Sequence, residues 1–186
     1  VLISGTGSIA IGRDSSGREH RCGGWGWLVD GGGSAMDIGH DGLALSLRMA
    51  DGRVPETGLK QALWQALEVQ HPHELKALVV DPHFGAAGFA RLAPVVSAQA
   101  AAGDGPAQQV IAHAGRQLAD LVAGVARNLE LTAPPICCSG GAISHLEPLQ
   151  KQFKQQLTLL LPKVKLVSAR GDACSGALAL AQALSS

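Results

Sequence analysis

The sequence contains no tyrosine and only 3% aromatic residues, so it offers few rings on which nucleic-acid bases could stack. It also lacks a surplus of either charge, because Lys plus Arg and Asp plus Glu each number 15 among 186 residues. Nucleic acids attract proteins mainly through excess positive charge. We therefore expect no nucleic-acid partner.

Long apolar runs are missing too, since no stretch of about 18 consecutive apolar residues occurs, and we expect no membrane-spanning helix. The first residues do not combine a basic segment with an apolar block, as a signal peptide would, which favours a cytoplasmic location. Cysteine is scarce, and no two cysteines form a CxxC pair. We interpret Cys22, Cys137, Cys138 and Cys174 as reduced, buried thiols and predict no metal site.

What the sequence does contain is an apolar run that leads directly into a glycine loop. Residues 1–3 are apolar, and the next five are Ser4, Gly5, Thr6, Gly7 and Ser8. Glycines let backbone N–H groups converge on an anion, and the three hydroxyls can donate to the same oxygens. The segment predicts a phosphate-binding loop, and a tight hairpin turn is the alternative.

A second transition from apolar residues to glycines lies far downstream. There, residues 136–138 run into Ser139, Gly140, Gly141 and Ala142. Two such transitions in one chain predict that one nucleotide is held between them.

Residues 23–34 contain six glycines and two tryptophans, which is too flexible a composition for a regular helix or strand. Trp25 and Trp27 have two interpretations. They either close the side of the core or line a ligand pocket, because aromatic faces pack well on the apolar faces of sugars.

Turn residues and apolar periodicity predict a mixed α/β sheet. A β-hairpin is expected from 9–12 and 19–22, and the best-defined helix is expected over about 104–129, before Pro134. Residues 71–84 remain unassigned. The other expected elements are helices over 34–49, 55–69, 85–102, 145–160 and 173–184 and strands at 136–138 and 163–167.

The string VLISGTGS, followed by a hairpin and by GGWGW 22 residues on, resembles the BadF/BadG/BcrA/BcrD ATPase family, and within it the N-acetylglucosamine and glucosamine kinases. The likeness extends over residues 1–186. It implies a ribonuclease H-like mixed sheet flanked by helices, as in the C-terminal lobe of actin-like ATPases. It also implies that ATP, with Mg²⁺, phosphorylates an amino sugar at a hydroxyl, O6 in our interpretation, and it is compatible with a homodimer.

The resemblance implies a role for each matching segment. Ser4, Gly5, Thr6, Gly7 and Ser8 correspond to the phosphate loop, Ser139, Gly140, Gly141 and Ala142 to the adenosine motif, and Gly24, Trp25 and Gly26 to a segment near the sugar. Relatives carry an acidic residue where this chain has Gly31. Either Asp30, one position earlier, takes over the sugar contact, or that contact is lost.

In this family the other phosphate loop and the catalytic aspartate precede VLISGTGS, so we expect the catalytic residues upstream of residue 1 and no activity from the fragment alone. The start inside an apolar strand, without methionine, favours a piece of a longer protein. Two alternatives stay open. One is an activator ATPase of a CoA dehydratase or reductase, although its iron–sulfur cluster needs several thiolates at one site. The other is a nucleotide-binding module without catalysis.

Overall fold

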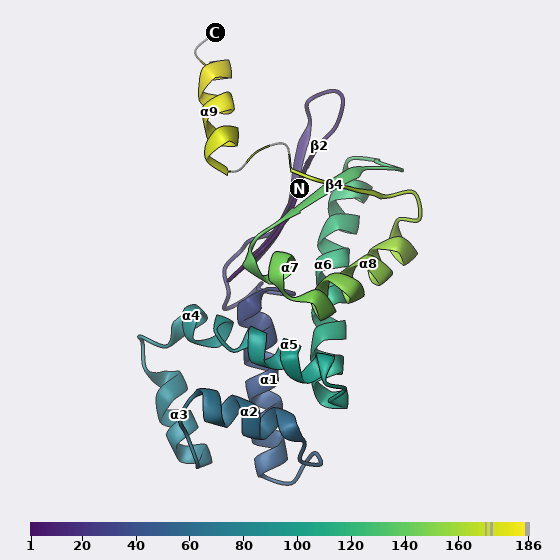
Figure 1. The fold of residues 1–186 in the computed structure, drawn as a ribbon. Helices are drawn as coiled ribbons and strands as arrows, with labels where there is room; N and C mark the ends of the chain where they lie inside the picture. Colours follow the sequence, from purple (N-terminus) through teal and green to yellow (C-terminus); the bar gives the residue numbers. More distant parts are fainter. Residues whose placement is uncertain (170, 172, 185–186) are drawn as a thin grey trace.

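The structure is a computed structural model that describes residues 1–169, 171 and 173–184 (Figure 1). Its centre is a five-stranded sheet in the order β3-β2-β1-β4-β5. β2 is antiparallel to both of its neighbours, whereas β1, β4 and β5 run parallel. The predicted mixed α/β sheet is therefore confirmed. The strands are β1 Leu2–Ser4, β2 Ser8–Arg13, β3 Glu19–Gly23, β4 Pro135–Ser139 and β5 Lys165–Val167.

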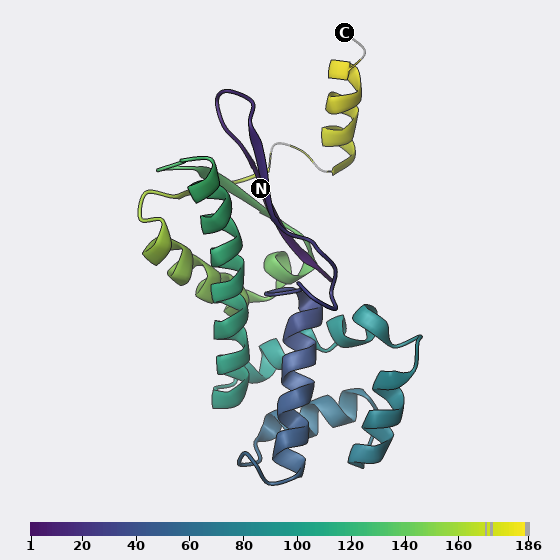
Figure 2. The ribbon, with the colours of Figure 1, turned by 180° about the vertical axis from the view of Figure 1, so that it is seen from behind.

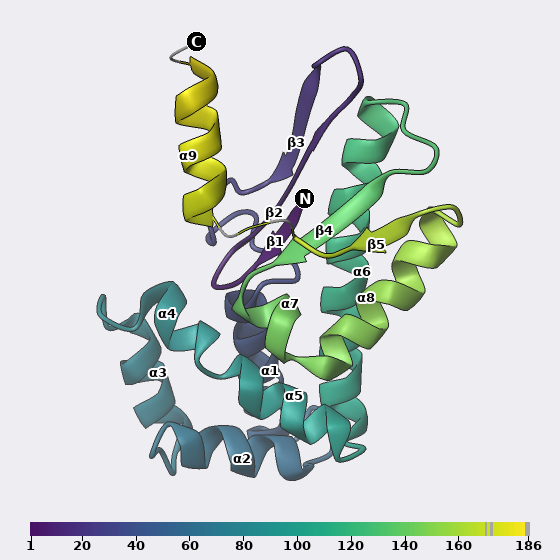
Figure 3. The same ribbon diagram turned by 45° about the horizontal axis from the view of Figure 1, so that its top comes forward.

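The helices form two groups (Figures 1 and 2). α6 packs on the sheet and against α8, while α1 to α5 form a helical layer beyond the edge where β1 and β4 end. In Figure 3, α9 lies across the sheet from α6 and α8. Within the described ranges, no helix is long and apolar enough to cross a membrane. The helices are α1 Ala35–Ala50, α2 Gly58–Ala66, α3 Pro72–Val80, α4 Gly85–Ala90, α5 Ala93–Ala101, α6 Gly105–Asn128, α7 Gly141–His145, α8 Glu147–Leu160 and α9 Ala173–Leu184.

α6 is the scaffold of the molecule, as its periodicity predicted. Asp104 caps it by accepting a hydrogen bond from the Ala107 N–H at 3.0 Å, and the same carboxylate accepts from the Leu59 N–H at 3.1 Å. One stripe of the helix is buried, and it contacts the sheet, α1, α5 and α8. Apolar residues at spacings of three and four make this stripe. The helix therefore joins the sheet to the helical layer.

The expected hairpin and first helix are confirmed as well. β2 pairs with β3, and the turn between them is held by Asp14, whose Oδ1 accepts hydrogen bonds from the Ser16 and Arg18 N–H groups. Ser34 caps α1 by accepting from the Asp37 N–H at 3.2 Å. These are local interactions that short polar residues make at turns and helix starts.

Proline explains two differences from the predicted helices. The helix expected over 85–102 is two helices, α4 and α5, because Pro94 has no N–H to continue the hydrogen bonding of α4. The helix expected from residue 145 is α8, which begins at Glu147 with Pro148 in its first turn, and the short α7 precedes it. The predicted helix over 55–69 is shorter and begins at Gly58.

The structure also describes the unassigned segment and the four cysteines. The unassigned residues 71–84 contain α3. All four cysteines are free, but Cys174 is exposed and the other three are only half-buried, so the interpretation of all four as buried thiols is wrong.

Gly39 of α1 allows α4 to pack against it at close range. A Cβ at this position would overlap the carbonyl oxygen of Phe89, which is backbone and cannot rotate away. We expect Gly39→Ala to lower the free energy of unfolding by about 1–3 kcal/mol, even though alanine favours helices. Urea denaturation measures this, with Gly105→Ala as the control because a Cβ there meets open space. Equal stability of the two variants would contradict the close packing.

Candidate functional site

The two glycine loops predicted from the sequence lie side by side. β1 and β4 are parallel neighbours, with Leu2 opposite Cys138 and Ile3 opposite Ser139, so both strands end at the same edge of the sheet. A Cβ on Gly140, whose φ is +104°, would overlap the carbonyl oxygen of Ser4. The loops are thus packed backbone against backbone, and only glycine fits at that point.

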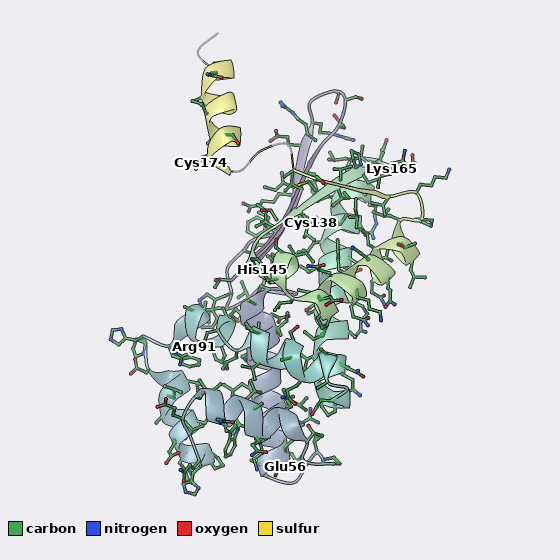
Figure 4. The ribbon with its side chains drawn as sticks, in the orientation of Figure 1. Glu56, Arg91, Cys138, His145, Lys165 and Cys174 are labelled. Atoms are coloured by element: carbon green, nitrogen blue, oxygen red, sulfur yellow. The ribbon has the colours of Figure 1, made fainter. Side chains whose placement is uncertain are left out.

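Figure 4 helps to locate the second loop, because it labels Cys138 on β4 and His145 at the end of α7. Ser139 and Gly141 of this loop are exposed. Ala142 is buried and belongs to the hydrophobic core. Its methyl group therefore packs inside the protein, and the exposed surface of the loop comes from its neighbours.

The tip of the first loop is a short turn with an accessible backbone. The Gly5 N–H donates to the Gly7 carbonyl at 2.9 Å, and Thr6 and Gly7 are exposed. Nothing lies within 4 Å of the position that a Cβ on Gly7 would take. Gly7 is therefore not required by packing, and the free space next to it is where an anion could approach the backbone.

Ser4 and Ser8 have a different environment from the tip of the loop. Both are buried, with 0% and 5% of their surface exposed. The Ser4 hydroxyl donates to the Gly33 carbonyl at 3.0 Å, and the Ser8 hydroxyl donates to the Gly32 carbonyl at 2.7 Å. Since each hydroxyl has one hydrogen to donate, both are engaged within the protein. These two serines hold the loop to residues 32–33.

The Trp25 side chain is exposed to solvent near the start of the glycine-rich segment. It is 66% exposed, and the Arg21 guanidinium lies 4.2 Å from the centre of its ring. The interpretation of Trp25 as closing the core is therefore wrong. Trp27 is also exposed, and its ring lies 6.3 Å from that of Phe89.

Asp30 makes two hydrogen bonds within this segment. Its carboxylate accepts from the Trp25 N–H at 3.4 Å, and its own N–H donates to the Gly26 carbonyl at 2.8 Å. Gly24 and Gly26, on either side of Trp25, both have positive φ angles of +77° and +103°. The segment is thus a closed loop, with Asp30 at its base.

A cavity of about 540 Å³ lies between this loop, α1 and α6, and contains side chains that sequence reasoning missed. The Asp37 carboxylate accepts from the Gly33 N–H at 2.9 Å, and burial raises the pKa of this carboxyl. A hydrogen bond with Asp41 raises the pKa of His40. Gln117 Oε1 is buried and has no hydrogen-bond partner among the described residues. Only Asp37, in the first turn after Ser34, had a signal in the sequence, as a helix-start acid.

The donor set fits a nucleotide better than a resident metal ion. Backbone N–H groups and glycines with open space suit phosphate oxygens. No group of three His, Cys, Asp or Glu side chains in the described part of the chain could hold a metal ion.

The mixed sheet flanked by helices is the fold of actin-like ATPases, and solved structures of candidate sugar kinases share it. Residues 1–181 match the BadF/BadG/BcrA/BcrD ATPase family, and the chain belongs to this family.

Two curated relatives are kinases. An N-acetylmuramic acid/N-acetylglucosamine kinase from Clostridium acetobutylicum is 30% identical over 184 residues, which are 98% of this chain and 60% of the relative. An N-acetyl-D-glucosamine kinase from Dictyostelium discoideum is 31% identical over 185 residues, which are 97% of this chain and 58% of the relative. The chain therefore spans about three fifths of the length of these proteins.

Two solved structures are similar in fold. A crystal structure from Chromobacterium violaceum, described as a candidate N-acetylglucosamine kinase, has a TM-score of 0.78 and 27% identity, covering 96% of this chain and 57% of the other. A second one, from Porphyromonas gingivalis, has a TM-score of 0.62 and 16% identity, covering 94% and 56%. The second likeness supports the fold alone.

Gly140 and Gly141 form a matched pair for testing how the two loops pack. Alanine at position 140 has to adopt a positive φ and meets the Ser4 backbone, whereas a Cβ on Gly141 meets nothing within 4 Å. We expect Gly140→Ala to lower the free energy of unfolding by about 1–3 kcal/mol. Gly141→Ala should change it by less than about 0.5 kcal/mol. Chemical denaturation of both variants measures the difference, and a Gly140→Ala protein as stable as the Gly141→Ala protein would argue against the packed loops.

Proposed function

We propose that this chain is the ATP-binding lobe of an amino-sugar kinase, which transfers the γ-phosphate of ATP to a hydroxyl, O6 in our proposal, of glucosamine or N-acetylglucosamine. The observation that carries the proposal is the meeting of three glycine segments at one edge of the sheet. Gly140 packs on Ser4, and Ser4 and Ser8 bond to Gly33 and Gly32. Family membership and the kinase relatives support this assignment.

On the nucleotide side, the loop of Gly5, Thr6 and Gly7 binds the β- or γ-phosphate, through the exposed backbone of Thr6 and Gly7. Gly140 and Gly141 face the adenosine, and Ser4, Ser8, Ser139 and Ala142 complete the two loops. Mg²⁺ would accompany the nucleotide and offset the negative charge of its phosphates, which is its general role in phosphoryl transfer. The accessible backbone at Thr6 and Gly7 supports this placement.

On the sugar side, the loop that bears Trp25 approaches the amino sugar, with Gly24 and Gly26 beside the ring. Asp30 takes the place of the acidic residue that relatives carry at the position of Gly31. Its carboxylate lies at the base of this loop, where it bonds to the Trp25 N–H. A carboxylate so placed can accept hydrogen bonds from sugar hydroxyls.

In this proposal the chain is the C-terminal lobe of a longer cytoplasmic enzyme, which is compatible with a homodimer. The catalytic residues and the other phosphate loop belong to the remaining part, so the lobe alone binds nucleotide without turnover. Isothermal titration of the lobe with a non-hydrolysable ATP analogue, and an ADP-release assay of the full-length protein with both amino sugars, test the two halves of this assignment. Turnover by the isolated lobe would contradict the placement of the catalytic residues.

The two alternative functions have less support. A CoA-dehydratase activator holds an iron–sulfur cluster with several thiolates at a subunit interface, and Cys137 and Cys138, on β4 before the second glycine loop, are poorly placed for this. A nucleotide-binding module without catalysis would bind the ATP analogue but leave the full-length protein inactive in the ADP-release assay.

Gly7→Val separates binding from folding. The space beside Gly7 is open, so the side chain should fit, and the free energy of unfolding should change by less than about 0.5 kcal/mol. A bound phosphate would occupy the same space, so the affinity for the ATP analogue should fall at least about tenfold, or 1.4 kcal/mol. Titration calorimetry and urea denaturation of the same preparation measure both. Unchanged affinity in a folded variant would remove Gly7 from the phosphate site.

Asp30→Ala tests the sugar side in the full-length protein. Losing a charged hydrogen-bond acceptor costs about 1.5–3 kcal/mol, so kcat/KM for the sugar should fall roughly ten- to a hundredfold. Nucleotide affinity should stay near its original value. Steady-state kinetics with the sugar, and titrations with the sugar and with the ATP analogue, are the measurements. Equal losses for both ligands would mean that Asp30 only steadies the loop.

A further inference from the structure

Ser4 and Ser8 occupy the neck of the first glycine loop. They face each other across β1 and β2, in the last pair before the chain turns through Gly5, Thr6 and Gly7. Both are buried, and their hydroxyls point to the Gly33 and Gly32 carbonyls rather than to the tip of the loop. Because Ser4 and Ser8 connect the tip to β1 and β2, any displacement of the tip relative to these strands involves both serines.

The segment that accepts these hydrogen bonds consists of glycine alone. Residues 31–33 are all glycine, so they have no side chains and the largest backbone freedom of any residue type. Three side-chain hydrogen bonds hold them, from the two serine hydroxyls and to the Asp37 carboxylate from the Gly33 N–H, beside the Ser34 N–H on the Gly31 carbonyl and packing against α6. Two of these three side-chain restraints come from the first glycine loop.

The restraint continues from the glycines to the tryptophan. Asp30 directly precedes Gly31. Its N–H donates to the Gly26 carbonyl at 2.8 Å, and its carboxylate accepts from the Trp25 N–H at 3.4 Å. A connected set of hydrogen bonds and short peptide segments therefore runs from Ser8 to Trp25. It joins the loop proposed for phosphate to the loop proposed for the sugar.

We propose that Ser4 and Ser8 are positioning residues that couple the two loops, so that a phosphate bound by Gly5, Thr6 and Gly7 orders residues 24–33 for the sugar. This inference rests on the proposed function and adds to it a connection between the two ligands. An anion that draws the loop N–H groups together stabilises one arrangement of the neck. The serine hydroxyls hold the Gly32 and Gly33 carbonyls in the matching arrangement. Because the glycine segment then has less conformational freedom, it loses less conformational entropy when the sugar binds.

Ser46 provides the matched control. It is also fully buried, and its hydroxyl also donates to a backbone carbonyl, that of Leu43 at 2.7 Å, while accepting from the indole N–H of Trp64. Ser46 lies in α1, within the helical layer, and contacts neither glycine loop through these bonds. Ser46→Ala therefore removes a buried serine without touching the coupling.

Amide hydrogen exchange of the chain, followed by mass spectrometry with and without a non-hydrolysable ATP analogue and Mg²⁺, is the test. In the unchanged chain, the analogue should slow exchange both in residues 4–8 and in residues 24–33, the latter at least about fivefold, the lower end of coupling between sites. In Ser8→Ala, and separately in Ser4→Ala, residues 4–8 should still be protected when saturated, while protection of 24–33 falls below about twofold. Ser46→Ala should behave like the unchanged chain.

Each outcome is decisive. Full protection of residues 24–33 in both Ser4→Ala and Ser8→Ala would overturn the coupling and leave the proposed nucleotide site standing. Absence of protection at residues 4–8 in the unchanged chain would overturn the nucleotide site and the coupling with it. Ser8→Thr keeps the hydroxyl, so recovered protection of residues 24–33 in this variant supports a role for the hydrogen bond itself. If Ser46→Ala lost as much protection in residues 24–33 as Ser4→Ala and Ser8→Ala, the loss would reflect general destabilisation, and the proposal would be overturned.

Discussion

The parallel pairing of β1 with β4 is the constraint on which the candidate site depends. It brings the ends of two strands that are far apart in the sequence to one edge of the sheet, so that both glycine loops emerge together. The pairing tolerates no side chain at Gly140, because the Ser4 carbonyl occupies the place of a Cβ. β1 is only three residues long, yet it is the central strand, and its loop also contacts the start of α1 through the Ala35 N–H and the Gly5 carbonyl.

Much of the fold could be predicted from local patterns, because the interactions that form it are local. The turn at Asp14, the cap at Ser34 and the apolar stripe of α6 are each encoded within a few residues of where they act. The break between α4 and α5 could also have been predicted, because Pro94 has no N–H with which to continue a helix. Periodicity does not encode which strands are neighbours, so it could not predict that β1 lies between β2 and β4.

The residue types of the candidate site could be predicted from the sequence, but the directions of its side chains were harder to predict. The glycines of both loops were identified, but the inward direction of the Ser4 and Ser8 hydroxyls depends on Gly32 and Gly33, which are distant in sequence. Trp25 had two equally reasonable interpretations, and its exposure is decided by the path of a glycine-rich loop that has no periodicity. The cavity beside Asp37 involves α6, so no pattern within α1 could reveal it.

The pairing of Ile3 with Ser139 also has a consequence for how the chain reaches its native state. β1 can form a hairpin with β2 early, because the two strands are adjacent in sequence. The other edge of β1 can pair only after β4 has been synthesised. Closing so long a stretch of chain is entropically costly and slow compared with local contacts. During synthesis, the first glycine loop therefore leaves the ribosome well before the surface that completes it, and until then β1 presents an unpaired edge on which a chaperone or a neighbouring nascent chain could act.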